Sequence, residues 1–143
     1  IRQCFKENPQ RVKAIAKLNE HGADIATSGL IDFGNSKRAT FDISFECTRR
    51  SEFEAFGALG RVKCPTVWQP EDKQAKIIIN TERSGLTEEA VPAANHFILE
   101  INHFNKVVNS DIAPKLSNED AFWNAKTLES IEQSIKADGW VTL

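Results

Sequence analysis

Hydrophobic and polar residues alternate strictly over residues 41–47, and this is the clearest pattern in the chain. A period of two predicts a strand with one buried face and one face in contact with water. An apolar run within residues 75–81 predicts a second strand that is buried on both faces or nearly so. Weaker patterns predict further strands at residues 30–33, 62–68 and 140–143.

Apolar residues three and four positions apart predict helices in the segments between these strands. Asn8 followed by Pro9 is typical of a helix start, and Gly22 is typical of a helix end. Ser117, three residues before Asp120, resembles a capping box. Four helices are therefore expected, at residues 9–21, 51–60, 87–108 and 117–139.

The predicted order of elements indicates an α+β fold. From Phe41 onward the order is βαββαβ, with one additional helix before the last strand. We therefore expect a ferredoxin-like βαββαβ sandwich with an N-terminal helix and an extra C-terminal helix. No repeat, low-complexity tract or linker divides the chain, so residues 1–143 are expected to form a single α+β domain.

Composition is that of an ordinary globular protein, with 41% hydrophobic and 27% charged residues. Three cysteines at wide spacing form neither a disulfide framework nor a CxxC pair, which favours a reducing, cytoplasmic location. No apolar run approaches the ~18–20 residues that cross a bilayer. The chain holds no Met, so Ile1 is not a translation start; whether processing or trimming removed what preceded it stays open.

The charge is uneven along the chain. Residues 87–143 hold four Lys/Arg and nine Asp/Glu, and thus a net charge of −5. This balance argues against nucleic acid and is compatible with a basic protein partner. An acidic helix surface in contact with solvent would give the same balance. The residues expected to contact a protein partner are Glu88, Glu89, Glu119, Asp120 and the aromatic Trp140.

The sequence carries no constellation that predicts catalysis, metal binding or cofactor binding. His96, Glu100 and His103 share one helical face, but the two histidines lie about 10.5 Å apart along the axis, too far to hold one ion readily. Cys64 has basic neighbours and no adjacent base that would activate it. GxGxxG and GxxxxGK[ST] motifs are absent, and no RNP1-like run accompanies the predicted sheet.

Short motifs resemble the RraB-type regulators of ribonuclease E. Residues 18–25, Leu-Asn-Glu-His-Gly-Ala-Asp-Ile, are similar to that family's L-x-x-x-G-x-D-L helix end. The strand–helix–Gly run of residues 41–60 and the terminal Asp138-Gly139-Trp140 are also similar. The family has one long helix where residues 87–137 predict two, and its best-known members are more acidic. The resemblance implies a ferredoxin-like, non-enzymatic adaptor that binds another protein.

These features together favour a non-enzymatic regulatory or inhibitory protein-binding domain. Two alternatives stay open at this point. A toxin-neutralising immunity protein would have the same physical requirements and a single tight partner. A small-molecule-binding or enzymatic ferredoxin-like domain would need a pocket with converging polar groups.

Overall fold

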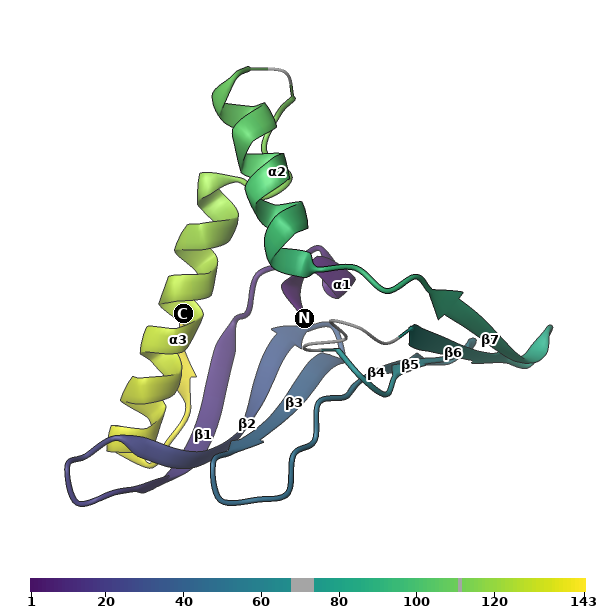
Figure 1. Ribbon diagram of the computed structural model, residues 1–143. Coiled ribbons are helices and arrows are strands. Elements are labelled where there is room, and N and C mark those ends of the chain that lie inside the picture. The colour runs from purple at the N-terminus through teal and green to yellow at the C-terminus, as the bar shows by residue number, and fades with distance from the viewer. Residues whose placement is uncertain (68–73, 111) are drawn as a thin grey trace. The chain divides into compact units, whose positions relative to one another are not determined.

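The computed structural model describes residues 1–67, 74–110 and 112–143 and divides them into two compact units (Figure 1). Unit 1 consists of Ile1–Cys47 and Lys115–Leu143, and unit 2 consists of Thr48–Pro114. The single domain expected for residues 1–143 stays a prediction. Trp68 and the turn expected at residues 69–73 lie outside the described residues.

Unit 1 is a four-stranded antiparallel sheet with strand order β3-β2-β1-β8, and a long helix lies along one of its faces (Figure 1). The β2–β3 hairpin turns at Asn35 and Ser36, which both have positive φ. The elements of this unit are α1 (Arg2–Phe5), β1 (Arg11–Leu18), β2 (Asp24–Gly34), β3 (Lys37–Ser44), α3 (Asn118–Ala137) and β8 (Val141–Thr142).

The helix predicted at residues 9–21 is wrong, because β1 occupies most of that segment. Its sequence, Arg-Val-Lys-Ala-Ile-Ala-Lys-Leu, also has a period of two. Val12 and Ala14 are buried, whereas Arg11, Lys13 and Ile15 are exposed on the other face. β1 pairs with β2 along its whole length, and this pairing provides hydrogen-bond partners for the backbone N–H and C=O groups of β1. A helix would pair the same groups within itself. Tertiary pairing therefore decides between two patterns that the sequence supports about equally.

The core of unit 1 forms where β1 and β2 meet α3. Val12, Ile31 and Phe33 are its buried hydrophobic members, and the Phe5 ring packs edge-on against Phe33 with centroids 4.9 Å apart. Ile131 of α3 also packs against this cluster. The inward alternation of β1 and β2 thus creates an apolar face on the sheet, and α3 covers part of that face.

Small polar residues on α3 bring this helix close to the sheet. Thr127, Ser130 and Ser134 are its buried residues. The hydroxyl of Ser134 accepts a hydrogen bond from Ala14 N (2.9 Å) and donates one to Gly139 O (2.5 Å). β8 pairs with β1 only at residues 11 and 12, so the Ser134 hydroxyl takes the place of a strand partner for Ala14.

We expect Ser134→Ala to reduce the free energy of unfolding of unit 1 by about 1–3 kcal/mol, because it leaves the buried Ala14 N–H without its acceptor. Ser130→Ala is the matched control: it lies on the same face, is also buried, and gains the same helix propensity. Urea unfolding followed by tryptophan fluorescence measures both variants. Equal stability of the two variants would contradict this role for Ser134.

Unit 2 holds a second antiparallel sheet, with strand order β4-β5-β6-β7, followed by one helix. β6 coincides with the strand predicted at residues 75–81, but its side chains are half-buried or exposed, so the expected burial on both faces is wrong. β6 pairs with β5 and β7. The elements of this unit are β4 (Phe53–Gly57), β5 (Gly60–Cys64), β6 (Ala75–Thr81), β7 (Gly85–Val91) and α2 (His96–Val108).

The α+β class is confirmed, but the ferredoxin-like βαββαβ order is wrong for the described residues. The helix expected at residues 51–60 is instead the β4–β5 hairpin, whose ends pair at Gly57 and Gly60. Without that helix the split βαβ unit cannot form. The helix expected from residue 87 begins only after β7 and Pro92, with Asn95 as its N-cap. The helix predicted after Ser117 is confirmed, including the hydrogen bond from Asp120 N to the Ser117 hydroxyl.

Candidate functional site

Unit 1 holds a cavity of about 670 Å³ between α3 and the inner face of the sheet. We call it the α3 groove. Its floor comes from β1, β2 and β3, one wall is α3, and α1 lies at one end. Hydrophobic side chains provide most of the lining, among them Leu18, Ile31, Phe33, Phe41, Ile43, Leu128, Ile131 and Ile135.

The groove follows from the spacing of residues in both elements. Leu128, Ile131 and Ile135 are three and four residues apart, so they form one stripe along α3. Phe41 and Ile43 are two apart on β3 and share its inner face. Although they line the groove, Ile43 remains 58% exposed and Leu128 60% exposed. The groove therefore has a buried floor, where Ile31 and Phe33 belong to the core, and an exposed apolar rim at Ile43 and Leu128.

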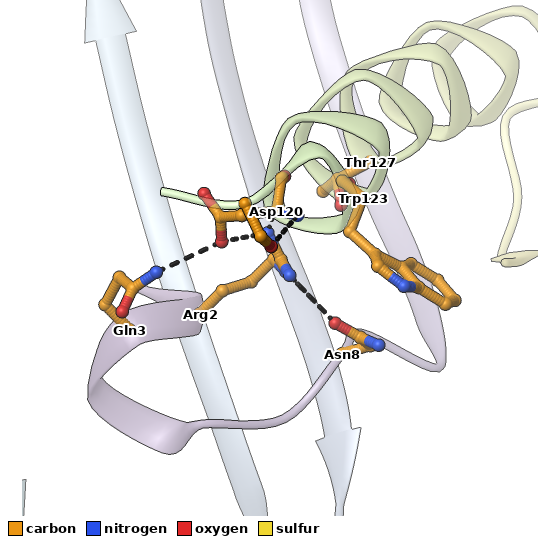
Figure 2. Close-up of polar contacts among 7 residues, drawn as sticks. Arg2, Gln3, Asn8, Asp120, Trp123 and Thr127 are labelled. Carbon is orange, nitrogen blue, oxygen red and sulfur yellow. Dashed lines mark hydrogen bonds and ion pairs between the residues drawn. The ribbon is translucent and has the colours of Figure 1, made fainter. Parts of the chain in front are cut away.

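Polar residues clamp α1 to α3 at one end of the groove (Figure 2). The guanidinium of Arg2 donates to Asp120 Oδ1 (2.7 Å) and to the Asp120 carbonyl oxygen (2.9 Å). It also donates to Asn8 Oδ1 from Nε and Nη2. Gln3 Nε2 donates to the same Asp120 carboxylate at 3.1 Å. Because these contacts engage the Asp120 carboxylate, we assign Asp120 a structural role.

The other end of the groove is also polar. Thr27, which is buried, donates its hydroxyl proton to Asp24 Oδ2 at 2.8 Å. Lys136 and Glu132 form an ion pair on the last turns of α3. Thr27 is thus paired with Asp24, and Lys136 with Glu132. Among the described residues, no group of three or more His, Cys, Asp or Glu is placed to hold a metal ion. The mainly apolar lining of the groove suits an apolar or amphipathic ligand.

The acidic residues expected to contact a partner lie in both units. Glu88 and Glu89 are exposed on β7, and Glu88 pairs with Lys76 of the neighbouring strand at 2.9 Å. Glu119 is exposed in the first turn of α3, beside the paired Asp120. Carboxylates in this turn favour the helix N-terminus electrostatically. A partner-binding role for these residues stays a prediction.

Trp140 takes part in a cluster that sequence reasoning did not find. The Arg11 guanidinium lies over the Trp140 ring, 4.6 Å from its centroid, and donates to Asp32 Oδ2 at 2.8 Å. Gly34 N donates to the other oxygen of Asp32 at 2.9 Å. This backbone hydrogen bond, and then the Arg11 hydrogen bond, lower the pKa of Asp32 below its ordinary value of 3.8.

The lowered pKa of Asp32 predicts how stability depends on pH. A carboxyl group with a depressed folded-state pKa stabilises the fold above its unfolded-state pKa and loses that contribution as pH falls through the folded-state pKa. We expect wild type to be more stable than Asp32→Asn above about pH 5, with a difference that narrows steadily toward about pH 2. Urea unfolding across this range measures it, and a difference independent of pH would contradict the assignment.

The remaining candidate residues lie in unit 2. His96 and Glu100 are on α2, and the His96 ring stacks at a tilt on the adjacent Phe97 with centroids 4.1 Å apart. Cys64 is half-buried at the end of β5, where its backbone pairs with Phe53. Cys4 and Cys47 are exposed free thiols of unit 1. Among the described residues, no helix is both long and apolar enough to cross a membrane.

No protein-family model and no curated protein matches the chain. Solved structures do match. The aldose-aldose oxidoreductase of Caulobacter crescentus, complexed with glycerol, aligns with 99% of this chain at a TM-score of 0.81 and 15% identity. A putative NADPH-dependent oxidoreductase of Desulfitobacterium hafniense aligns with 99% of this chain at a TM-score of 0.78 and 15% identity. The 3-ketoreductase KijD10 of Actinomadura kijaniata, in complex with NADP and TDP-benzene, aligns with 89% of this chain at a TM-score of 0.78 and 19% identity.

The fold of this chain is therefore similar to part of these oxidoreductases. The chain spans 43%, 44% and 39% of the three matched chains, so less than half of each. This likeness corrects the resemblance to RraB-type regulators of ribonuclease E, which is wrong. The short motifs behind that resemblance lie on different elements, since residues 18–25 span a β-hairpin turn instead of a helix end. The expectation of a regulatory or inhibitory protein-binding domain is contradicted by the same likeness.

Proposed function

We propose that this chain is part of a nicotinamide-dependent oxidoreductase, in which it supplies the antiparallel-sheet portion and other polypeptide holds the nucleotide. The observation that carries the proposal is the alignment of 99% of the chain with an oxidoreductase at a TM-score of 0.81. The matched KijD10 structure contains NADP, and the Desulfitobacterium hafniense protein is described as NADPH-dependent. The chain's own fold is thus that of a portion of such enzymes.

The residues of this chain do not fit a dinucleotide. A pyrophosphate is typically bound by a glycine-rich turn at a helix N-terminus, where backbone N–H groups and the helix dipole favour anions. The first turn of α3 instead carries Glu119 and Asp120, and the residues before α2 are Pro92-Ala93-Ala94-Asn95. Phosphate at α3 would therefore meet two carboxylates. No GxGxxG motif occurs anywhere in the 143 residues.

The reaction class follows from the matched enzymes. A nicotinamide cofactor held by the rest of such an enzyme would supply a hydride to a carbonyl carbon whose oxygen takes up a proton, or would accept a hydride from a carbon whose hydroxyl loses its proton. Two of the matched proteins are an aldose-aldose oxidoreductase and a 3-ketoreductase. We therefore place the substrate among small molecules with an oxidisable hydroxyl or a reducible carbonyl, with sugars as the first class to test.

The experiment that tests the proposal is an activity assay on the natural gene product that contains this sequence. We expect NADPH or NADH absorbance to fall with keto sugars and aldoses, or the oxidised cofactor to be reduced with polyols. Heat-inactivated protein is the control. A correctly folded gene product that turns over neither nucleotide with any of these classes, and binds neither, would overturn the proposal.

A further inference from the structure

α3 covers only part of the inner face of the unit 1 sheet, because it packs on β1 and β8 at one side of the strand order. On β2 the side chains of Thr27, Ile31 and Phe33 are buried. Ile43 of β3 lines the groove yet is 58% exposed, and it faces the open side of α3. The uncovered part of the inner face therefore lies between α3 and β3, above a buried floor.

The shape of the groove matches a helix. Its wall is the stripe Leu128, Ile131 and Ile135, and its two ends lie near Asp120 and Lys136. These residues are 16 positions apart on α3, which is about 24 Å at 1.5 Å per residue. A helix of about four turns would fill that length. Its apolar residues would have to recur every three or four positions to face both floor and wall.

α1 indicates where such a helix connects to the chain. Ile1, Arg2 and Gln3 all line one end of the groove. The backbone there is already helical, since the Ile1 carbonyl accepts from Cys4 N at 2.9 Å and the Arg2 carbonyl from Lys6 N at 2.7 Å. The Arg2 clamp fixes this turn to the start of α3 (Figure 2). Any helix that continues α1 toward lower residue numbers therefore leaves from the groove's own end.

We propose that the polypeptide segment immediately N-terminal to Ile1 forms an amphipathic helix that lies in the α3 groove and runs into α1. It enters near Lys136 and ends beside Asp120, so it is antiparallel to α3. This direction pairs opposite ends of the two helix dipoles. The inference rests on the proposed function for the existence of further polypeptide, because the matched oxidoreductases are more than twice as long as this chain.

The test compares unfolding of three proteins: the 143-residue chain, the same chain extended by about 20 natural N-terminal residues, and the natural gene product. Leu128→Ala is the probe because Leu128 lines the groove yet is 60% exposed without an occupant. Phe122→Ala is the matched control on the same helix, 59% exposed and outside the groove lining. Urea unfolding and concentration-dependent sedimentation are measured for each.

We expect Leu128→Ala to raise the unfolding constant by about 30-fold or more in the extended chain and the natural gene product, as for a buried leucine. In the 143-residue chain its effect should stay below about threefold, like that of Phe122→Ala. A large effect in the natural gene product alone would assign the groove to another segment and overturn the proposal. A large effect in the 143-residue chain that grows with protein concentration would indicate that a second copy fills the groove, and it would also overturn the proposal. A natural gene product with no segment before Ile1 would overturn it as well. None of these measurements depends on nucleotide binding. Failure of this inference can therefore be distinguished from failure of the proposed function.

Discussion

Replacing Phe33 by alanine should reduce the free energy of unfolding of unit 1 by about 3–5 kcal/mol. Phe33 is 1% exposed and is the largest fully buried side chain among the described residues. Its ring packs against Phe5 and lies in one cluster with Val12 and Ile31. Truncation removes the hydrophobic contribution of the ring and leaves a cavity that the paired strand β2 cannot close. Since a domain of this size is stable by only about 5–15 kcal/mol, the variant should be marginal at room temperature.

Phe45→Ala is the matched control, because Phe45 belongs to the same unit and is 90% exposed. Its effect should remain within about 0.5 kcal/mol, as for other surface positions. Trp123 and Trp140 both lie in unit 1, whereas Trp68 falls in the residue range of unit 2. Tryptophan fluorescence during urea unfolding of proteins that also carry Trp68→Phe therefore follows unit 1. If the two phenylalanine variants lost similar stability, the inward face of β2 would not be the core.

Gly60→Ala should destabilise the sheet of unit 2 by at least about 2 kcal/mol, for two independent reasons. Gly60 has φ +150°, which side-chain-bearing residues rarely adopt, and such strain costs about 1–3 kcal/mol. A Cβ at this position would also lie 2.4 Å from the Asn80 carbonyl oxygen, which is backbone of the paired strand β6 and must shift. Overpacking of this kind costs about another 1–3 kcal/mol.

Gly57→Ala tests whether the destabilisation expected for Gly60→Ala comes from the position of Gly60 or from the loss of any glycine in this hairpin. Gly57 pairs with Gly60 across the same hairpin, yet a Cβ there has no atom within 4 Å. Amide hydrogen exchange of Val62 and Ile79, which pair between β5 and β6, reports the stability of this sheet. We expect protection to fall at least about 30-fold in Gly60→Ala and little in Gly57→Ala. Equal protection in the two variants would contradict the described backbone at Gly60.

The sequence predicts the elements of this fold best where one pattern has no competitor. The apolar run of β6 and the cap at Ser117 each have one interpretation, and both are confirmed. Residues 11–18 support either a helix or a strand, because Ile15 breaks their alternation and creates a helical spacing. In the segment from Ser51 to Gly60, apolar residues three positions apart favour a helix, whereas the structure has a two-residue turn between Gly57 and Gly60. In both segments long-range strand pairing, which no local pattern encodes, determines the structure.

The candidate site was hidden from sequence reasoning for a related reason. The α3 groove unites Leu18, Phe41 and Leu128, which are far apart in the chain and unremarkable in composition. Only the alternation of inward-facing apolar residues on β1 and β3 indicates the floor of the groove, and the residues of β1 also fit a helix. Acidic residues near the chain end were visible, but Asp120 proves to be paired with Arg2. The oxidoreductase likeness depends on the arrangement of elements and carries at most 19% identity in the matches described above.

One titration tests most directly our proposal that these 143 residues form the portion of an oxidoreductase that does not hold the nucleotide. NADPH is added to the isolated chain and, in parallel, to the natural gene product that contains it, and binding is followed by calorimetry. We expect saturable binding to the gene product and none to the chain. Saturable binding by the chain itself, or by neither protein while both are folded, would contradict it.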